Sequence, residues 1–146
     1  MPKKSLVLGI VAMIIIAFLS CSLPKLPTAG SKFLDTSGNF TLYVSNQSFA
    51  ADPVDIRIKI DDELVVSGYF WVGDQHKFTP FRLSLSEGQH RICIWSLKGK
   101  AQMISTFEVK DHDIGIVTFW YSSESRSDPT PSQFEFHIEQ GPLIIM

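Results

Sequence analysis

Residues 54–60 read VDIRIKI, and this stretch decides the fold class because its aliphatic and charged residues alternate strictly. Side chains of an extended chain point alternately to opposite faces, so the four aliphatic residues share one face and the charged residues the other. This period of two, with its β-branched residues, predicts a half-buried strand. Asp61 and Asp62 follow at once and predict a tight turn into a second strand at 63–72.

The same alternation recurs on both sides of this hairpin, separated by Gly-, Pro- or charge-rich turns. The other expected strands cover residues 40–45, 78–86, 90–96, 101–109, 112–121 and 134–139. Eight short strands without an amphipathic helix predict an all-β domain, a single antiparallel β-sandwich of Ig-like or jelly-roll type. Residues 39–146 suffice for one such core but not for two.

The amino terminus has the character of an export signal. Lys3 and Lys4 precede an uncharged, almost wholly apolar run, residues 6–19, which has the length of a signal-peptide h-region. An uncleaved membrane anchor, with the run extended to Leu23, is an alternative. Simple secretion is another, although cleavage after Ser20 would place the bulky Phe18 where a small residue is expected.

The residues Phe18-Leu19-Ser20-Cys21 resemble the lipobox of bacterial lipoproteins, although Phe18 and Leu19 depart from its usual residues. The resemblance implies that residues 1–20 are a cleaved signal peptide and that Cys21 carries a diacylglycerol and an amine-linked fatty acid such as palmitate. Residues 21–38, rich in Pro, Gly and small polar side chains, would then be a flexible tether before the β-sandwich at 39–146. The expected location is the cell envelope, and Ser22 after the cysteine implies the outer membrane in a Gram-negative host.

Composition narrows the partners. Residues 1–20 contain two lysines and no acid, so removing them takes the basic residues from 13 to 11 against 15 acidic ones. Without a basic stripe, nucleic-acid binding by phosphate neutralisation is not expected. Lipidation of Cys21 would leave Cys93 without a partner in the chain, as a small buried core residue.

The search for catalytic and metal-binding motifs is negative, so we expect no enzyme, no cofactor and no metal site. The histidines are scattered, and we expect His76 and His90 to be surface or rim residues. Asp61, Asp62 and Glu63 at one turn, and Asp111 and Asp113 at another, are interpreted as solvated acids. Calcium binding by these turns is the weaker alternative.

Aromatic residues at the strand ends carry the main functional indication. In the pairs Phe70–Trp71 and Trp120–Tyr121, neighbouring side chains point to opposite faces, so one ring of each pair should face outward. Exposed flat rings suit stacking on sugars or packing against a protein. Trp71, Trp120 and Tyr121 are therefore the candidate binding residues, with edge protection of the sandwich as the alternative role.

Residues 58–65 and 83–95 are similar to PEGA-type surface domains and to carbohydrate-binding jelly-roll modules. Leu85, Gly88, His90 and Ile92 match the pattern L-x-x-G-x-H-x-I, whereas Asp62 stands where a glycine is common. The resemblance implies a β-sandwich that binds rather than catalyses. The expected function is a non-catalytic binding module for an envelope protein or carbohydrate, held at the membrane by its lipid. A structural subunit of an envelope assembly, or a hydrolytic enzyme, is the alternative.

Overall fold

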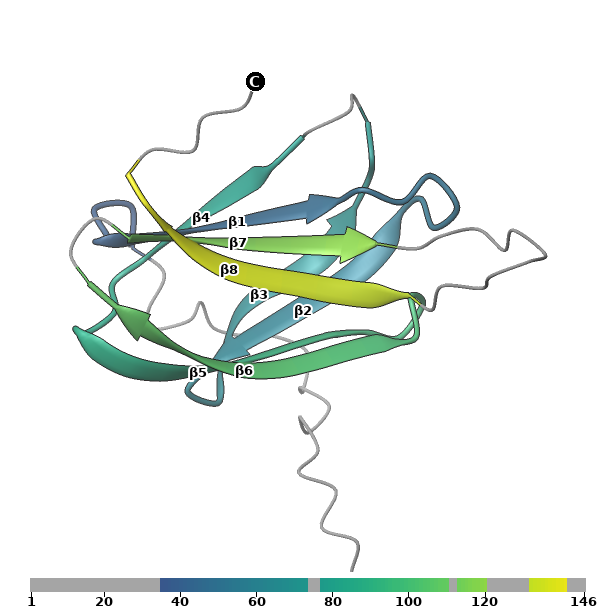
Figure 1. Ribbon diagram of the computed structural model, residues 1–146. Helices are drawn as coiled ribbons and strands as arrows, with labels where there is room; N and C mark the ends of the chain where they lie inside the picture. The colour runs from purple at the N-terminus through teal and green to yellow at the C-terminus, as the bar shows by residue number, and fades with distance from the viewer. Residues whose placement is uncertain (1–34, 74–76, 111–112, 121–131, 142–146) are drawn as a thin grey trace, which may run out of the picture.

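The computed structural model describes residues 35–73, 77–110, 113–120 and 132–141, and within them the chain forms eight strands (Figure 1). The expected signal peptide, most of the expected tether, Tyr121 and the apolar tail lie outside the described residues. The strands are β1 (Phe40–Asn46), β2 (Val54–Ile60), β3 (Glu63–Phe70), β4 (Thr79–Leu83), β5 (Gly88–Ser96), β6 (Ala101–Val109), β7 (Asp113–Trp120) and β8 (Gln133–Gln140).

The strands form two four-stranded sheets, in the orders β4-β1-β7-β8 and β3-β2-β5-β6. The predicted all-β sandwich is confirmed. Within the described strands every pairing is antiparallel except that of β1 with β7, which is parallel. The predicted tight turn is also confirmed: Asp61 and Asp62 both have positive φ, 47° and 66°, as a two-residue hairpin turn with right-handed strand twist requires.

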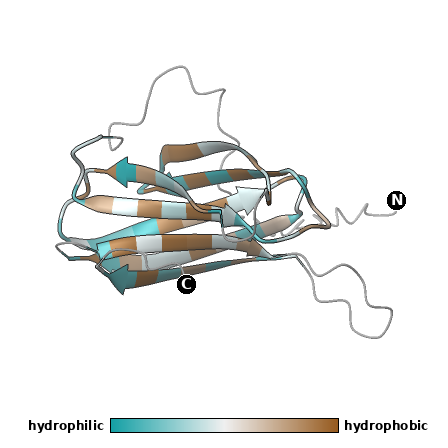
Figure 2. Cartoon of the chain, turned by 90° about the horizontal axis from the view of Figure 1, so that it is seen from above, coloured by the Kyte–Doolittle hydropathy of each residue, from teal (hydrophilic) through white to brown (hydrophobic). Residues whose placement is uncertain are grey.

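The core lies between the sheets and is made by the alternate residues that the period of two predicts (Figure 2). Phe40, Leu42 and Val44 from β1 face the four aliphatic residues of β2, and all of them are fully buried. Phe107 on β6 contacts the ring of Phe136 on β8 at 5.2 Å, edge to face, and so joins the two sheets along one side. Along the other side lie the edge strands β3 and β4.

Strand direction gives the sandwich two distinct ends. β1 and β7 run parallel and finish together, and β3 and β5 finish at the same end because each is antiparallel to β2 (Figure 1). Asp113 lies at the opposite end as the first residue of β7. It is buried, with 3% exposed, and accepts the Lys110 N–H at 2.8 Å, so the interpretation of Asp113 as a solvated acid was wrong.

Candidate functional site

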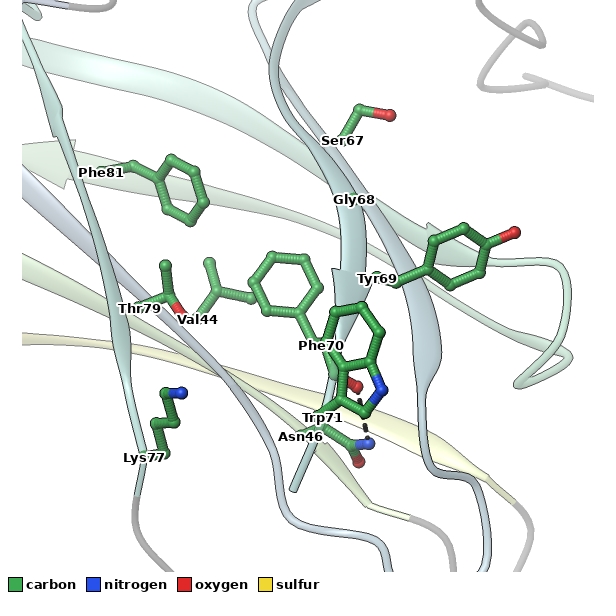
Figure 3. A pocket seen from close by; sticks show the side chains of 10 residues that line it. All are labelled: Val44, Asn46, Ser67, Gly68, Tyr69, Phe70, Trp71, Lys77, Thr79 and Phe81. Atoms are coloured by element: carbon green, nitrogen blue, oxygen red, sulfur yellow. Dashed lines mark hydrogen bonds between the residues drawn. The ribbon is translucent and has the colours of Figure 1, made fainter. Parts of the chain in front are cut away.

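A cleft of about 240 Å³ lies along the side where β3 and β4 form the sheet edges (Figure 3). Its floor is apolar: Phe70 of β3 and Phe81 of β4 approach with their ring centroids 6.3 Å apart, beside Val44 of β1. The complete lining is Val44, Asn46, Ser67, Gly68, Tyr69, Phe70, Trp71, Lys77, Thr79 and Phe81. An apolar floor with a few polar side chains around it is the usual composition of a small-molecule site.

The rim on the β3 side carries two aromatic rings. Trp71 is 59% exposed and Tyr69 is 62% exposed, whereas Phe70 between them is buried, as the strand alternation predicts. In the close-up view, Trp71 lies on the β3 side and Lys77 and Phe81 on the other, while the Tyr69 ring of the same rim points away from Lys77 and Phe81 (Figure 3). The cleft thus offers flat apolar faces, three hydroxyls and an ammonium group around one apolar floor.

Asn46 fixes the wall that carries Trp71. Its side chain is almost fully buried, and its amide N–H groups donate to the Phe70 carbonyl at 3.1 Å and to the Ala51 carbonyl at 2.8 Å. The next peptide group is held by the β1–β2 loop, because the Val72 N–H donates to Asp52 Oδ1 at 3.0 Å. Trp71 therefore leaves a backbone anchored on both sides, so that its ring needs little ordering when a ligand binds.

The second predicted binding residue, Trp120, lies elsewhere. It ends β7 next to the core residue Phe119, so its ring points to the outer face of its sheet, where it is 42% exposed. Its Nε1–H donates to Glu135 Oε2 of β8 at 3.0 Å. The structure does not bring Trp120 into the cleft with Trp71, and Tyr121 lies outside the described residues.

His90 was expected at the surface, and this expectation was wrong. Its side chain is buried, with Nδ1 2.6 Å from Asp61 Oδ2 and Nε2 2.8 Å from the carbonyl oxygen of Ser86. Ser86 Oγ lies 3.5 Å from Nε2, so a Ser-His-Asp set is present in outline. Because Nε2 faces the carbonyl oxygen as a donor, it cannot accept the serine proton as a general base must. The contacts join the β2–β3 turn to the start of β5.

The acids at this turn have structural partners. Asp61 accepts the Arg91 N–H at 3.0 Å in addition to its contact with His90, and Asp62 lies 3.9 Å from Arg91 Nη1. Across the described part of the chain, His, Cys, Asp and Glu side chains form no group of three that could hold a metal ion. In the same segments, no helix is long and apolar enough to cross a membrane.

Cys93 is buried, as expected. It alternates with the core residues Ile92 and Ile94 and so lies on the outer face of its sheet, and it is disulfide-bonded. The only other cysteine in the sequence is Cys21, outside the described residues. A sulfur in a disulfide cannot also carry a thioether-linked lipid, so an intrachain bond of Cys93 to Cys21 and acylation of Cys21 exclude each other.

Sequence reasoning identified Trp71 but missed the rest of the cleft. Asn46, Lys77, Thr79 and Phe81 have no motif in common, and only the long-range placement of β3 opposite β4 brings them together. No protein-family model matches the chain, and no curated protein matches its sequence.

Proposed function

We propose that the domain is a non-catalytic binding module whose ligand enters the cleft between β3 and β4. The observation that carries this proposal is Trp71: a large ring, 59% exposed, held by an anchored backbone at the rim of an apolar depression. Exposing such a ring to water is unfavourable, and a ligand that covers it removes that cost. The Ser67, Thr79 and Tyr69 hydroxyls and the Lys77 ammonium group would select the orientation of the ligand.

A carbohydrate is the ligand class that this combination supports best. Sugars present an apolar face of C–H groups that stacks on indole and phenol rings, and hydroxyls at their edge that bond to polar side chains. The cleft volume of about 240 Å³ lies below the roughly 300–1,000 Å³ of pockets that enclose a whole ligand. It therefore suits one ring of a longer glycan, with neighbouring rings on the open surface beside Tyr69.

A protein ligand is the second candidate, and the free edge of β3 favours it. Among the described strands, β3 is hydrogen-bonded on one side only, to β2. Its sequence ELVVSGYF has no Lys or Pro, the residues that commonly block pairing at an exposed edge. An extended peptide could add there as a further strand and place a side chain in the cleft. A structural subunit would show a broad apolar patch that includes residues 143–146, and these residues lie outside the described part of the chain.

The test compares Trp71→Ala with Trp120→Ala in binding to purified cell-wall glycan and to soluble oligosaccharides. A sugar ring that covers on the order of 60 Å² of indole contributes roughly 1.5 kcal/mol, or about tenfold in affinity. We expect this loss for Trp71→Ala and little change for Trp120→Ala, with folding checked by circular dichroism. Equal affinity of wild type and Trp71→Ala would remove the cleft from the binding site. If Trp71→Ala unfolds, Lys77→Ala, at an exposed position of the opposite wall, replaces it in the comparison.

We also propose that the module acts at a membrane of the bacterial cell envelope, held by acylated Cys21. The apolar run before a lipobox-like sequence supports this anchor. A diacylglycerol joined by a third chain meets the requirement for stable anchoring, which a single acyl chain does not. The outer membrane is the proposed destination in a Gram-negative host, because Ser22 follows the cysteine. If Cys21 is the disulfide partner of Cys93, its sulfur cannot also carry the lipid, and the disulfide replaces the anchor.

A further inference from the structure

Exposed apolar side chains gather at one end of the sandwich, where β1, β3, β5 and β7 finish (Figure 1). Phe49 is 67% exposed in the loop after β1, Trp71 and Leu97 are each 59% exposed after β3 and β5, and Trp120 is 42% exposed at the end of β7. We call these four residues the apolar end. Single exposed apolar residues are common on protein surfaces, but four from four different segments at one end are a patch that requires an explanation.

Hydrogen bonds join the segments that carry these residues. The Gln47 N–H donates to the Phe119 carbonyl at 3.0 Å, and this bond joins the β1–β2 loop to the end of β7. Lys98 lies in the β5–β6 turn, and its Nζ donates to the carbonyl of Pro53 in the β1–β2 loop. Because Asp52 also holds the Val72 N–H, the β1–β2 loop contacts each of the other three segments. The apolar end is therefore one surface, not four independent loops.

Buried polar groups hold two of these segments in place. Asp55, 7% exposed, accepts the Ser96 hydroxyl and the Lys98 N–H at 2.8 Å each and the Leu97 N–H at 3.2 Å. Asn46, 2% exposed, bonds across the β1–β2 loop to the Ala51 carbonyl and the Ser48 N–H. These hydrogen bonds fix the backbone from which Leu97 and Phe49 project into solvent. The two side chains are therefore exposed because the fixed backbone places them there, and not because the loops are flexible.

Charge is distributed unequally between the two ends. Among the described residues, Lys77, Lys98 and Lys100 are exposed around the apolar end. Its exposed acids are Asp52, which accepts the Val72 N–H, and Glu135, which accepts the Trp120 Nε1–H. The opposite end carries more acids, with fewer cations among them: Asp35, Asp61, Asp62, Glu63 and Glu87 against Arg82, Arg91 and Lys110. A domain with excess acid overall therefore presents its apolar side chains together with lysines. This combination favours a partner that is both apolar and negatively charged.

We propose that the apolar end docks on the surface of a bilayer that contains anionic phospholipid. Trp, Phe and Leu side chains enter the boundary between headgroups and acyl chains, and lysines beside them contact the anionic headgroups. The acidic end then points away from the negative surface. A rigid protein partner would need a complementary acidic and apolar face, whereas a membrane supplies both properties without one.

The anchor proposed above permits this orientation. The described chain begins at Asp35, whose N–H donates to the Arg82 carbonyl at the acidic end. Fully extended, residues 21–34 reach at most about 50 Å, and a strand of nine residues is roughly 30 Å long. A chain anchored at Cys21 could therefore pass the domain and leave the apolar end on the bilayer. Docking itself rests on the end surface and not on the ligand of the cleft.

The experiment places the full-length protein in vesicles and measures quenching of tryptophan fluorescence by lipids brominated near the headgroup. Trp95 is buried, so Trp71 and Trp120 report on the apolar end. One vesicle set is phosphatidylcholine alone, and the other contains roughly 30% phosphatidylglycerol. Variants Phe49→Ser and Leu97→Ser remove apolar tips, and Lys98→Gln and Lys100→Gln remove charge. Ile104→Ser is the matched control, because Ile104 is 44% exposed in the middle of β6, away from this end.

We expect quenching in the anionic vesicles that is weaker in phosphatidylcholine and in about 0.5 M NaCl, where charges are screened within a few ångströms. Each lysine variant should lower the ratio of docked to undocked domain about fivefold. The two tip variants should lower it further, and Ile104→Ser should not. Equal quenching in all variants, or none in wild type, would overturn the proposal. Glycan binding that persists without quenching would leave the proposed function standing and reject membrane docking alone.

Discussion

Replacing Asp55 with alanine should destabilise the domain more than any other single change to a charged side chain on its surface strands. The variant removes the acceptor of the Ser96 hydroxyl and of the Leu97 and Lys98 N–H groups. Ser96 is buried and has no access to water, so losing its bond to a carboxylate costs roughly 2 kcal/mol. The two turn N–H groups can bond to water instead and cost about 0.5–1 kcal/mol each. The expected loss is therefore about 3–4 kcal/mol.

The pH dependence of stability gives a second, independent measure. Burial raises the pKa of Asp55, but hydrogen bonds from the Lys98 N–H, the Ser96 hydroxyl and the Leu97 N–H, with the charge of Arg57, bring the pKa below its ordinary value. A carboxyl whose pKa is lower in the folded state stabilises the fold above its unfolded pKa of about 3.9. Its contribution is lost as the pH falls below that value through the folded pKa.

Urea denaturation followed by circular dichroism, repeated from about pH 7 to pH 3, measures both effects. The difference between wild type and Asp55→Ala should be constant above about pH 5 and should shrink as the pH falls below about 4. At neutral pH the midpoint of thermal unfolding should fall by at least about 12 °C. Asp62→Asn is the control, because 86% of that side chain is exposed and its nearest cation, Arg91, lies 3.9 Å away. A loss under about 0.5 kcal/mol for Asp55→Ala, equal to that of the control, would refute the reasoning.

Two further predictions concern the β5–β6 turn and the amino terminus. Gly99→Ala should cost about 1–3 kcal/mol, measured by urea denaturation, because the added Cβ would lie 2.6 Å from the Phe119 ring and 2.8 Å from Ser96 Oγ. Gly68→Ala, whose added Cβ would meet its nearest atom at 3.8 Å, is the neutral control, and equal stabilities would contradict the packing argument. The intact mass of the exported protein should correspond to a chain that starts at acylated Cys21, with Cys21→Ala unprocessed. A full-length chain two hydrogens lighter than its reduced form would instead assign Cys21 to the disulfide with Cys93.

The period of two was sufficient to predict the eight strands and the sandwich, because most strands have one face in the core and the other at least partly in solvent. It also predicted that Phe70 and Trp71 point to opposite faces, and Trp71 is the exposed member of the pair. The alternation could not show which strands form the edges of the sheets, since this depends on contacts between residues far apart in the chain. The cleft between β3 and β4 was therefore not predictable from the sequence, although one of its rings was.

The residues that sequence reasoning misplaced are polar ones with a specific partner. His90, Asp113 and Asp55 lie at strand ends or turns, where charged residues are usually solvated. His90 is buried because Asp61 and the Ser86 carbonyl satisfy its two nitrogens, and Asp55 because the β5–β6 turn supplies three donors. Composition and alternation carry no information about such partners. Burial of a polar group can be inferred only once the group that bonds to it has been placed.

Trp71 belongs to both proposed surfaces, and this has a thermodynamic consequence. A glycan that stacks on the indole covers one of the four apolar side chains of the end that would meet the bilayer. Ligand binding should then weaken docking, and the coupling must be reciprocal: vesicles should weaken ligand binding by the same factor. Trp120 is not among the residues that line the cleft, so its replacement should weaken docking without changing the affinity for the glycan. If ligand binding does not change vesicle docking, and vesicles do not change ligand binding, Trp71 takes part in only one of the two.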